Sequence, residues 1–391
     1  MAQKFNTMSG TTQASAQRGF VERVDLSTGA RRGLQNDALR TYRIALLPGD
    51  GVGPEVVAAA VGVLQAVESR LPGLHFDFEE FPVGAAEYLR GGDPLPPETF
   101  ERLPDFDAIL LGAMGLPEVR WPGGAEMSPQ LDLREQLDLY CGLRPIFLFH
   151  SGDSPLRDRP AGSIDFLLVR ESTEGLFSSR KNAVDPRADR VEDTMLVTRR
   201  GAERVIRSAF REALRRRKHV TLVDKANVLP SMVFFRKVFD EVAGEFPEVT
   251  TERMYVDAAA LYLLQRPDTF DVLVTENMFG DILSDLAAGL VGGMGMAPSA
   301  DIGSRYGVFQ PSHGSAPDIA GKGVANPVAT ILSAAMMAEW FGEDRIRRGA
   351  QMIRAAVQAV FHDRRARTRD MGGSWTTAEM ADAIRSALPA E

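Results

Sequence analysis

The chain has 391 residues, of which 44% are hydrophobic and 25% are charged. A single hydrophobic core stops growing at roughly 250 to 300 residues, so this length predicts two domains with a cleft between them. A formal net charge of −8 argues against a general nucleic-acid binder, which needs a basic surface. The composition excludes disorder and coiled coil as the overall class, and no apolar run reaches the roughly 18 residues of a membrane helix.

The first 40 residues are rich in Ser, Thr, Gln, Gly and Arg and have no sustained apolar period. They predict an extension, 1–40, outside the folded core. They also lack the apolar segment of a secretory signal, and the lone Cys141 cannot form a disulfide within the chain. We therefore expect a cytoplasmic protein.

The folded part begins with a predicted strand at 42–47, a Gly-rich turn and a helix with an apolar face. Further apolar strands are predicted at 107–113, 163–172, 219–227 and 270–277, with helices at 202–217 and 231–241. This alternation predicts an α/β fold with a largely parallel sheet covered on both faces. Sites in such sheets form where strands end, which draws attention to Arg170, Glu171, Asp224, Lys225, Glu276 and Asn277.

The turn PGDGVGPEV contains Gly49, Gly51 and Gly53 and invites comparison with a Rossmann nucleotide-binding turn. Its spacing departs from G-x-G-x-x-G, because the third glycine comes one residue early and Pro54 follows it. A tight turn that packs backbone against backbone explains the glycines equally well. We expect a fold other than the Rossmann fold.

Nine Lys and Arg residues fall between Arg199 and Lys218 and could indicate a nucleic-acid-binding helix. Apolar residues recur through the same stretch at helical spacing, which favours an amphipathic helix with a solvated basic face. These apolar residues are Val205, Ile206, Phe210 and Leu214.

Three arginines, Arg134, Arg144 and Arg170, each lie near the end of a predicted helix or strand. The planar guanidinium grips a carboxylate through two parallel hydrogen bonds, so converging arginines suit a substrate with two or more carboxylates. Each arginine alone is more often a partner in a surface salt bridge.

Asp281 and Asp285 stand four residues apart, on one face of a predicted helix. Adjacent carboxylates repel unless a cation joins them, although acidic residues near a helix start also complement its dipole. With a third carboxylate such as Asp257, these residues would form an oxygen-ligand site for Mg2+ or Mn2+.

Two other segments could carry chemistry. Lys225, followed by Asn227, ends an apolar strand and could transfer protons if its surroundings lowered its pKa, although an exposed loop lysine is the commoner case. The Gly-rich loop around His313, Gly314 and Ser315 leads through Asn326 into a helix. It could offer hydrogen-bond donors to a nucleotide, or it could be an ordinary surface loop.

Eight motifs in order make the chain, from about residue 42 to its C-terminus, resemble the metal-dependent β-decarboxylating dehydrogenases, which act on 3-isopropylmalate, isocitrate, homoisocitrate and tartrate or D-malate. They are LPGDGVGPEV, LREQLDLYCGLRP, VRESTEG, TLVDKANVLP, MYVDAAA, TENMFGDILSDLAAGL, HGSAPDIAGKGVANP and TRDMGGSWTT. The resemblance implies a two-domain fold with a central sheet, distinct from the Rossmann fold. It implies a large nucleotide-binding domain at 41–139 and 292–391, and a small domain at 140–291 that forms the dimer interface.

The resemblance also implies roles for the candidate residues. Arg134, Arg144 and Arg170 would bind the malate part of the substrate, and Asp281 and Asp285 would bind the metal ion. Lys225 would be the general base and Asp257 would assist it and bind metal, both acting from the other subunit of a homodimer or larger homo-oligomer. Hydride would pass from C2 to NAD, CO2 would leave from C3, and the resulting enolate would then be protonated.

The resemblance places the nucleotide in the loop formed by His313, Gly314, Ser315, Ala316, Asp318, Ile319 and Asn326. Asp318 lies where the family distinguishes the adenosine ribose. An aspartate accepts hydrogen bonds from the free ribose hydroxyls but would repel a 2′-phosphate, so we expect NAD rather than NADP.

The group on C3 of the substrate would be recognised by Met127, Ser128, Gln130 and Leu131. Met127 and Leu131 favour an apolar group, whereas Ser128 and Gln130 favour a polar one. We expect 3-isopropylmalate, with tartrate, D-malate and isocitrate as alternatives. A non-catalytic regulatory homologue is a further alternative, disfavoured because Lys225 and all three acids are present.

Phe177 is the one clear departure from the family pattern. The family usually carries at this position a tyrosine thought to protonate the enolate. Phenylalanine fills the same space but has no proton to give.

Overall fold

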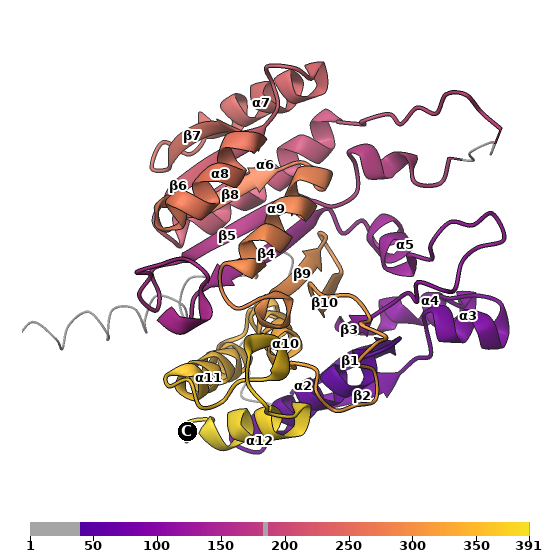
Figure 1. The fold of residues 1–391 in the computed structure, drawn as a ribbon, viewed down its shortest axis with the longest axis vertical. Helices are drawn as coiled ribbons and strands as arrows, with labels where there is room; N and C mark the ends of the chain where they lie inside the picture. Colours follow the sequence, from indigo (N-terminus) through magenta and orange to yellow (C-terminus); the bar gives the residue numbers. More distant parts are fainter. Residues whose placement is uncertain (1–39, 183–186, 391) are drawn as a thin grey trace, which may run out of the picture.

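The computed structural model describes residues 40–182 and 187–390 (Figure 1). The predicted extension at 1–40 lies, apart from its last residue, outside the described residues. Within the described ranges, no helix combines the length and the apolar character needed to cross a membrane.

A ten-stranded sheet runs through the molecule in the order β2-β1-β3-β10-β9-β4-β5-β8-β6-β7. The strands are β1 Arg40–Gly49, β2 Leu74–Glu80, β3 Ala108–Ala113, β4 Cys141–Phe147, β5 Asp165–Glu171, β6 His219–Asp224, β7 Thr250–Tyr255, β8 Val272–Thr275, β9 Pro298–Ile302 and β10 Gly307–Pro311. Strands at both ends pair in parallel, but β10 with β9, β9 with β4 and β4 with β5 pair antiparallel. The predicted α/β sheet is confirmed, and it is largely parallel as expected, since among the described residues six of its nine strand pairings are parallel and only the three in the middle are antiparallel.

The strand order reflects two parts of the chain. The five strands from β2 to β9 come from residues 40–113 and 298–311, and the five from β4 to β7 come from residues 141–275. The domain boundaries at 139/140 and 291/292 stay a prediction.

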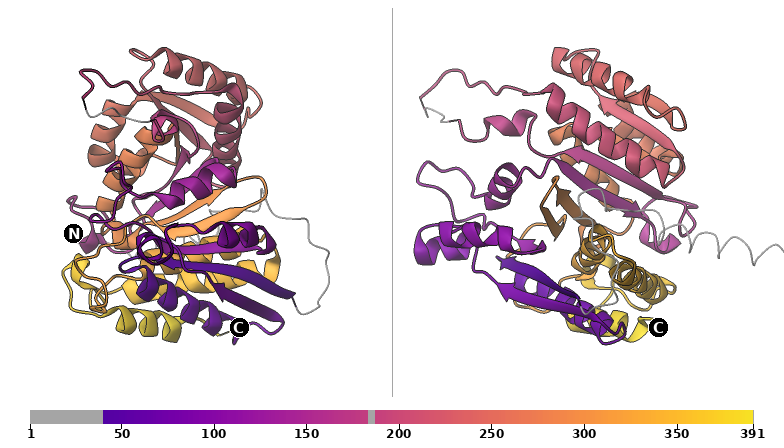
Figure 2. Two further views of the ribbon diagram at one scale, coloured as in Figure 1. Left: turned by 90° about the vertical axis from the view of Figure 1, so that its right-hand side faces the viewer. Right: turned by 180° about the vertical axis from the view of Figure 1, so that it is seen from behind.

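Helices cover both faces of the sheet (Figure 2). They are α2 Gly53–Glu68, α3 Ala85–Gly91, α4 Pro97–Arg102, α5 Pro129–Gln136, α6 Arg199–Leu214, α7 Pro230–Ala243, α8 Val256–Gln265, α9 Asn277–Gly289, α10 Val328–Trp340, α11 Asp344–Phe361 and α12 Thr377–Ala387. On the first face, α2, α6, α7, α10, α11 and α12 share one continuous apolar core. On the second face, α8 and α9 pack at one end and α4 and α5 at the other.

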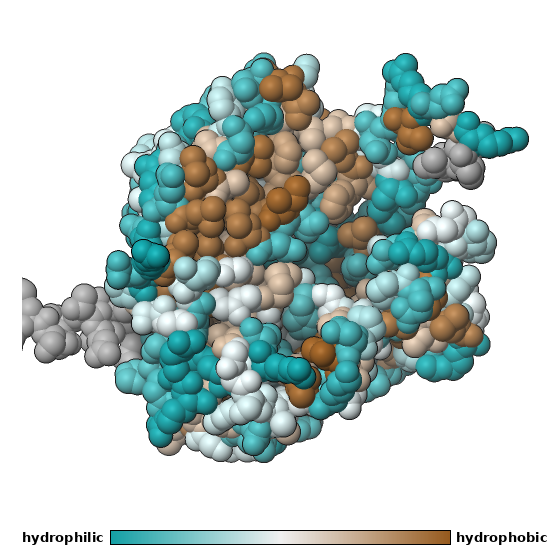
Figure 3. Space-filling model, viewed as in Figure 1, coloured by the Kyte–Doolittle hydropathy of each residue, from teal (hydrophilic) through white to brown (hydrophobic). Residues whose placement is uncertain are grey.

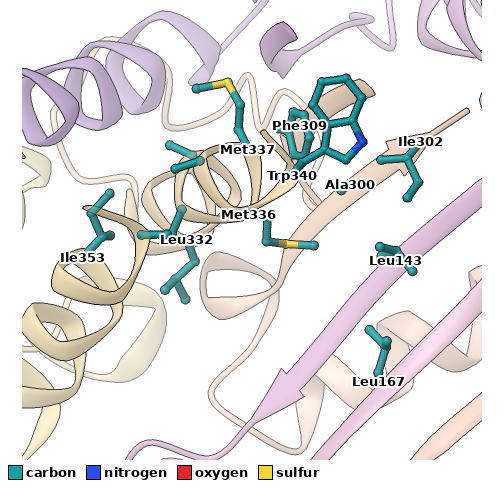
Figure 4. Packing of buried hydrophobic residues seen from close by; sticks show 14 of the residues in the cluster. Leu143, Leu167, Ala300, Ile302, Phe309, Leu332, Met336, Met337, Trp340 and Ile353 are labelled. Carbon is teal, nitrogen blue, oxygen red and sulfur yellow. The ribbon is translucent and has the colours of Figure 1, made fainter. Parts of the chain in front are cut away.

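The continuous core is centred on α10, all of whose residues are buried (Figure 4). A helix that is apolar on every side has no surface suited to water, so its sequence predicts burial. Met336 and Trp340 of α10 belong to the same cluster as Phe309 of β10 and Leu143 of β4. This helix therefore supports the middle strands from the first face.

The second face has two separate apolar clusters, and polar side chains lie between them. Side chains alternate along a strand, so a residue next to one in the continuous core points to the second face. In β5, Leu167 and Val169 belong to the continuous core, whereas Phe166 and Leu168 belong to the cluster under α8 and α9. By the same alternation, polar side chains of the middle strands reach the second face at Arg144, Arg170, Ser299, Asp301 and Gln310.

The basic stretch forms α6, and the prediction of an amphipathic helix is confirmed. Val205, Ile206 and Phe210 are buried in the continuous core. The basic side chains meet acids from neighbouring elements, including Arg199 with Glu241, Arg204 with Asp138, Arg207 with Glu245 and Arg216 with Asp165. These pairs leave little unbalanced charge for a nucleic acid to bind.

The glycines after β1 allow close backbone packing. A Cβ atom on Gly49 would lie 1.9 Å from the carbonyl oxygen of Ala113, and one on Gly51 would lie 1.9 Å from that of Ser315. Gly51 also has φ of +61°, which side chains disfavour. Beside it, the Val52 amide donates a 2.8 Å hydrogen bond to the Ser315 carbonyl. The turn thus fastens the end of β1 to the loop that contains Ser315.

Replacing Gly51 by Ala should lower the free energy of unfolding by about 2 kcal/mol or more, because the new methyl group needs both a strained φ and a displaced carbonyl. Gly62→Ala in α2 is the matched control, because its Cβ atom would meet nothing closer than 3.6 Å. That control should stabilise the protein by up to about 1 kcal/mol. Urea unfolding of both variants checks this, and equal midpoints would contradict it.

Candidate active site

A cleft of about 260 Å³ opens over the polar middle of the second face. Its walls come from β3, β4, β5, β9, β10, α5, α9 and the loop after β10, and the surface is hollowed there between the upper and lower parts of the molecule (Figure 3). The polar lining residues are Gln130, Arg134, Arg144, Arg170, Asp281, Ser284, Asp285, Ser299, Gln310, Ser312 and His313. The apolar part of the wall includes Leu111, Met114, Leu131 and Phe177.

The three predicted arginines converge in this cleft. Arg134 comes from α5, Arg144 from β4 and Arg170 from β5, and all three side chains are buried. Burial, reinforced by the positive charge of Arg134, lowers the pKa of Arg170 to about 10. Arg170 therefore stays charged at neutral pH, and the cleft presents three fixed cations to a ligand.

Each arginine has an anchor within the protein. Asp301 accepts a 3.1 Å hydrogen bond from Nε of Arg134 and one of 3.3 Å from Arg144. Arg170 donates to the side-chain oxygen of Asn277, at 2.9 and 2.6 Å, and forms an ion pair with Asp281. The guanidinium groups are thus held in place before any ligand binds.

Asp281 and Asp285 line the cleft from one face of α9, as predicted. Burial and the adjacent charge of Asp281 raise the pKa of Asp285. This repulsion is what a bound cation would relieve. Within the described part of the chain, no group of three or more His, Cys, Asp or Glu side chains gathers to hold a metal ion.

Lys225 and Asp257 lie together but outside the cleft of their own chain. The Lys225 ammonium pairs with the Asp257 carboxylate, and its hydrogen bond lowers the pKa of that carboxyl. Neither residue is among those that line the cleft. Asp257 is 68% exposed, so it is accessible from outside the chain.

An exposed apolar patch covers α8 and α9 (Figure 3). Leu261 is 49%, Leu264 44% and Ile282 60% exposed, although large apolar side chains usually avoid water. The spacing of Asp257, Leu261 and Leu264 puts them on one face of α8. Ile282 follows Asp281 in α9, so the patch adjoins both the cleft acids and Asp257.

A second pocket, of about 280 Å³, is formed by the predicted nucleotide loop. It is lined mainly by apolar groups, including Val52, Ile319 and Ala325, and also by Ala316, Val324, Asn326 and His313. His313 lines both pockets, so a single elongated ligand could extend from one to the other. Burial lowers the pKa of His313, and its buried Nε2 has no hydrogen-bond partner among residues 40–182 and 187–390.

The other predicted loop residues, Gly314, Ser315 and Asp318, do not line this second pocket. Gly314 lines the cleft, and Ser315 is buried, with its hydroxyl donating a 2.5 Å hydrogen bond to the Gly115 carbonyl. Asp318 is exposed and lines neither pocket, although its neighbour Ile319 does.

Of the four residues expected to recognise the group on C3 of the substrate, only two line the cleft. Gln130 and Leu131, in the first turn of α5, line the cleft. Met127 is buried in a small cluster with Ala85 and Val119, and Ser128 immediately precedes α5; neither lines the cleft. The apolar wall is supplied instead by Leu111 and Met114 together with Leu131.

Phe177 lies in the cleft wall, with its ring centre 5.4 Å from the Arg170 guanidinium. The position predicted to lack a tyrosine hydroxyl therefore faces the same space as the arginines.

Sequence reasoning did not identify Ser299, Asp301 and Gln310. They occur in β9 and β10, short strands in which polar residues alternate with Ala300, Ile302 and Phe309 of the core. This alternation could have identified them as site residues, because a charged side chain in a buried strand needs polar partners on the face to which it points.

Residues 43–384 match the family model described as isocitrate/isopropylmalate dehydrogenase. The chain is 47% identical over 360 residues to the 3-isopropylmalate dehydrogenase of Moorella thermoacetica, covering 89% of this chain and 99% of that one. Its identity to the enzyme of that name from Bacillus subtilis is 45% over 363 residues, covering 89% and 98%. The solved isocitrate dehydrogenase from Methylococcus capsulatus aligns with a TM-score of 0.79 at 39% identity, covering 89% of this chain and 99% of that one.

Proposed function

Since the chain belongs to the isocitrate/isopropylmalate dehydrogenase family of β-decarboxylating dehydrogenases, we propose that it oxidises and decarboxylates 3-isopropylmalate with NAD and Mg2+ or Mn2+. The convergence of three buried arginines and two carboxylates in one cleft carries this proposal. Relatives named 3-isopropylmalate dehydrogenase, at 42 to 47% identity, support the choice of substrate.

The cleft suits a branched diacid. Arg134, Arg144 and Arg170 can bind two carboxylates by charge-assisted hydrogen bonds. Leu111, Met114 and Leu131 offer an apolar wall to an isopropyl group, while Gln130 is the polar side chain nearby. This apolar part of the wall, together with the relatives named 3-isopropylmalate dehydrogenase, favours 3-isopropylmalate over tartrate, D-malate or isocitrate.

The acids of the cleft suit a divalent ion. Asp281 and Asp285 would bind it. Burial and, second, the charge of Asp281 raise the pKa of Asp285, and the ion would offset both effects. Asp257 from a second copy of the chain would complete the carboxylate set. When bound, the ion supplies Lewis-acid polarisation of the oxygen on C2. Arg170 would then share Asp281 with the ion while Asn277 continues to hold its guanidinium.

The second pocket suits the adenosine part of NAD, which accepts the hydride when bound. Ile319 and Ala325 would pack against the adenine ring, and His313 would contact the cofactor between the two pockets. The exposed Asp318 would accept hydrogen bonds from ribose hydroxyls and repel a 2′-phosphate.

Lys225 of a second copy, as the neutral amine, would remove the proton of the 2-hydroxyl, and Asp257 beside it would stabilise the ammonium group that forms. Their position outside the cleft of their own chain agrees with this sharing. The exposed Leu261, Leu264 and Ile282 would be covered in the homodimer that brings the two copies together.

The direct test is a set of steady-state rates on 3-isopropylmalate, isocitrate, tartrate and D-malate, each with Mn2+ and with NAD+ or NADP+. We expect the highest kcat/KM with 3-isopropylmalate and NAD+. A higher value with another acid would reassign the substrate. Preference for NADP+ would overturn the role of Asp318.

A mixture of two inactive variants tests the shared site. Lys225→Ala removes the base, and Asp281→Asn removes a charged ligand and should abolish most metal affinity and turnover. In a heterodimer of the two, one site has both residues intact, so re-equilibrated mixtures should regain up to about a quarter of wild-type activity, because half of random dimers are mixed and each has one intact site of two. Heterodimers that form without any activity would show that each chain uses its own Lys225.

Phe177→Tyr tests the missing proton donor. General-acid assistance is typically worth about 10²- to 10⁴-fold, so a restored hydroxyl should speed product formation more than NADH formation in a single turnover. Phe177→Leu is the control, because it keeps an apolar side chain and adds no proton. An equal change in both steps for Phe177→Tyr would indicate that Ser178, Ser179 or a water held by Lys225 already serves as the donor.

A further inference from the structure

Beneath the arginines of the cleft lies a buried carboxylate that belongs to no predicted set. Asp301 in β9 has a side chain that is 1% exposed and does not line the cleft. A buried charge persists only where opposite charges and hydrogen bonds compensate its lost hydration. The groups that bind the Asp301 carboxylate therefore indicate its role.

Its two oxygens serve different arginines. Oδ2 accepts from Nε of Arg134 at 3.1 Å and lies 3.1 Å from a second nitrogen of the same guanidinium. Oδ1 accepts from Arg144 at 3.3 Å. Arg134 comes from α5 and Arg144 from β4, so one carboxylate joins side chains from two elements.

A neutral residue completes the arrangement. The Gln310 side chain donates a 2.7 Å hydrogen bond from Nε2 to Oδ2 of Asp301. Gln310 lies in β10, which pairs antiparallel with β9. The amide therefore binds the same oxygen, Oδ2, that accepts from Arg134.

The sheet leaves room for this carboxylate at one glycine. Gly142 of β4 pairs with Asp301 on one side and Arg170 on the other. A Cβ atom on Gly142 would lie 3.0 Å from Oδ1 of Asp301 and 3.4 Å from a terminal nitrogen of Arg144. A side chain there would push apart the groups that Asp301 brings together.

We propose that Asp301 is a positioning residue, which orients Arg134 and Arg144 so that their free N–H groups meet the carboxylates of a diacid. The proposal rests on the proposed function only in taking a dicarboxylate as the ligand. Burial raises the pKa of Asp301, but Arg134, Arg144 and Arg170 together lower it to about 2. The carboxylate is therefore charged throughout the pH range in which the enzyme would be assayed.

Two effects of removing this charge have opposite signs. Asp301→Asn keeps the shape but leaves the cleft more positive, which by charge alone would tighten binding of a dianion. It also removes the acceptor that aligns two guanidinium groups, which would weaken binding. The sign of the change therefore distinguishes positioning from mere neutralisation.

The experiment measures binding of D-malate with Mn2+ by calorimetry, without nucleotide. D-malate carries the two carboxylates and the 2-hydroxyl common to every candidate substrate. We expect Asp301→Asn to raise the Kd for malate about tenfold or more, since charge-assisted hydrogen bonds are among the stronger ones. Affinity for NAD+, measured separately, should change less than threefold, because the second pocket contains none of these residues.

The matched control is Asp153→Asn. The Asp153 side chain is 2% exposed and accepts two hydrogen bonds from Arg367, at 2.9 and 2.8 Å, away from the cleft. It loses the same kind of ion pair, so it should reduce thermal stability and leave the malate Kd unchanged.

A rescue variant exchanges the two paired groups. Asp301→Asn combined with Gln310→Glu keeps one carboxylate and one amide at the same pair of positions, and should return the malate Kd to within threefold of wild type. If Asp301→Asn alone does not fold, Asp301→Glu decides, because it keeps the charge but displaces the carboxylate by one methylene group. Folded Asp301→Glu that binds malate within threefold of wild type would overturn the proposal.

Equal or tighter malate binding by folded Asp301→Asn would likewise overturn the proposal while leaving the proposed function intact. Absence of malate binding to the wild type would remove the diacid assignment, and the positioning role with it.

Discussion

Three guanidinium groups buried side by side impose the strictest condition on this structure. Their mutual repulsion and lost hydration would unfold the middle of the sheet unless negative or polar partners were fixed nearby. Asp301 holds two of them, and Asn277 with Asp281 holds the third. The positions of β4, β5, β9 and α9 are thereby tied to one another by charge as well as by apolar packing.

Period-two alternation lets the same strands build both the core and the cleft. In β9, Ala300 packs into the continuous core, while Ser299 and Asp301 point to the opposite face. The buried helix α10 reinforces this from below, because its Ser333 accepts from the Ser299 amide at 3.1 Å and donates to the Gln310 carbonyl at 2.8 Å. A change in the core beneath these strands would therefore be transmitted to the cleft.

Much of the fold was predictable where strands are long and apolar. The predicted runs at 42–47, 107–113 and 163–172 coincide with β1, β3 and β5, which are buried on both faces. The middle strands β9 and β10 were not predicted, because each is only five residues long and contains polar or proline residues.

Parts of the cleft were predictable for a similar reason. Arg134, Arg144, Arg170, Asp281 and Asp285 were identified by their chemistry and spacing, and they meet in one cleft. Asp301 could not be found this way, because its partner Arg134 lies 167 residues away and only the folded register brings them together. The roles proposed for Lys225 and Asp257 require a second chain, and the geometry of one chain shows only that these two residues pair outside its own cleft.

The pairing of β4 with β9 consists of three residue pairs, and it alone joins the two halves of the sheet among the described residues. One of these pairs is Gly142 with Asp301, so the junction between the two halves of the sheet is also where Asp301 holds two of the arginines. A ligand bound by both Arg144 of β4 and Arg134 of α5 would bridge the pairing of β4 with β9. Occupancy of the cleft would then stiffen the joint between the two halves of the sheet on its second face, opposite the apolar core that α10 shares with both halves.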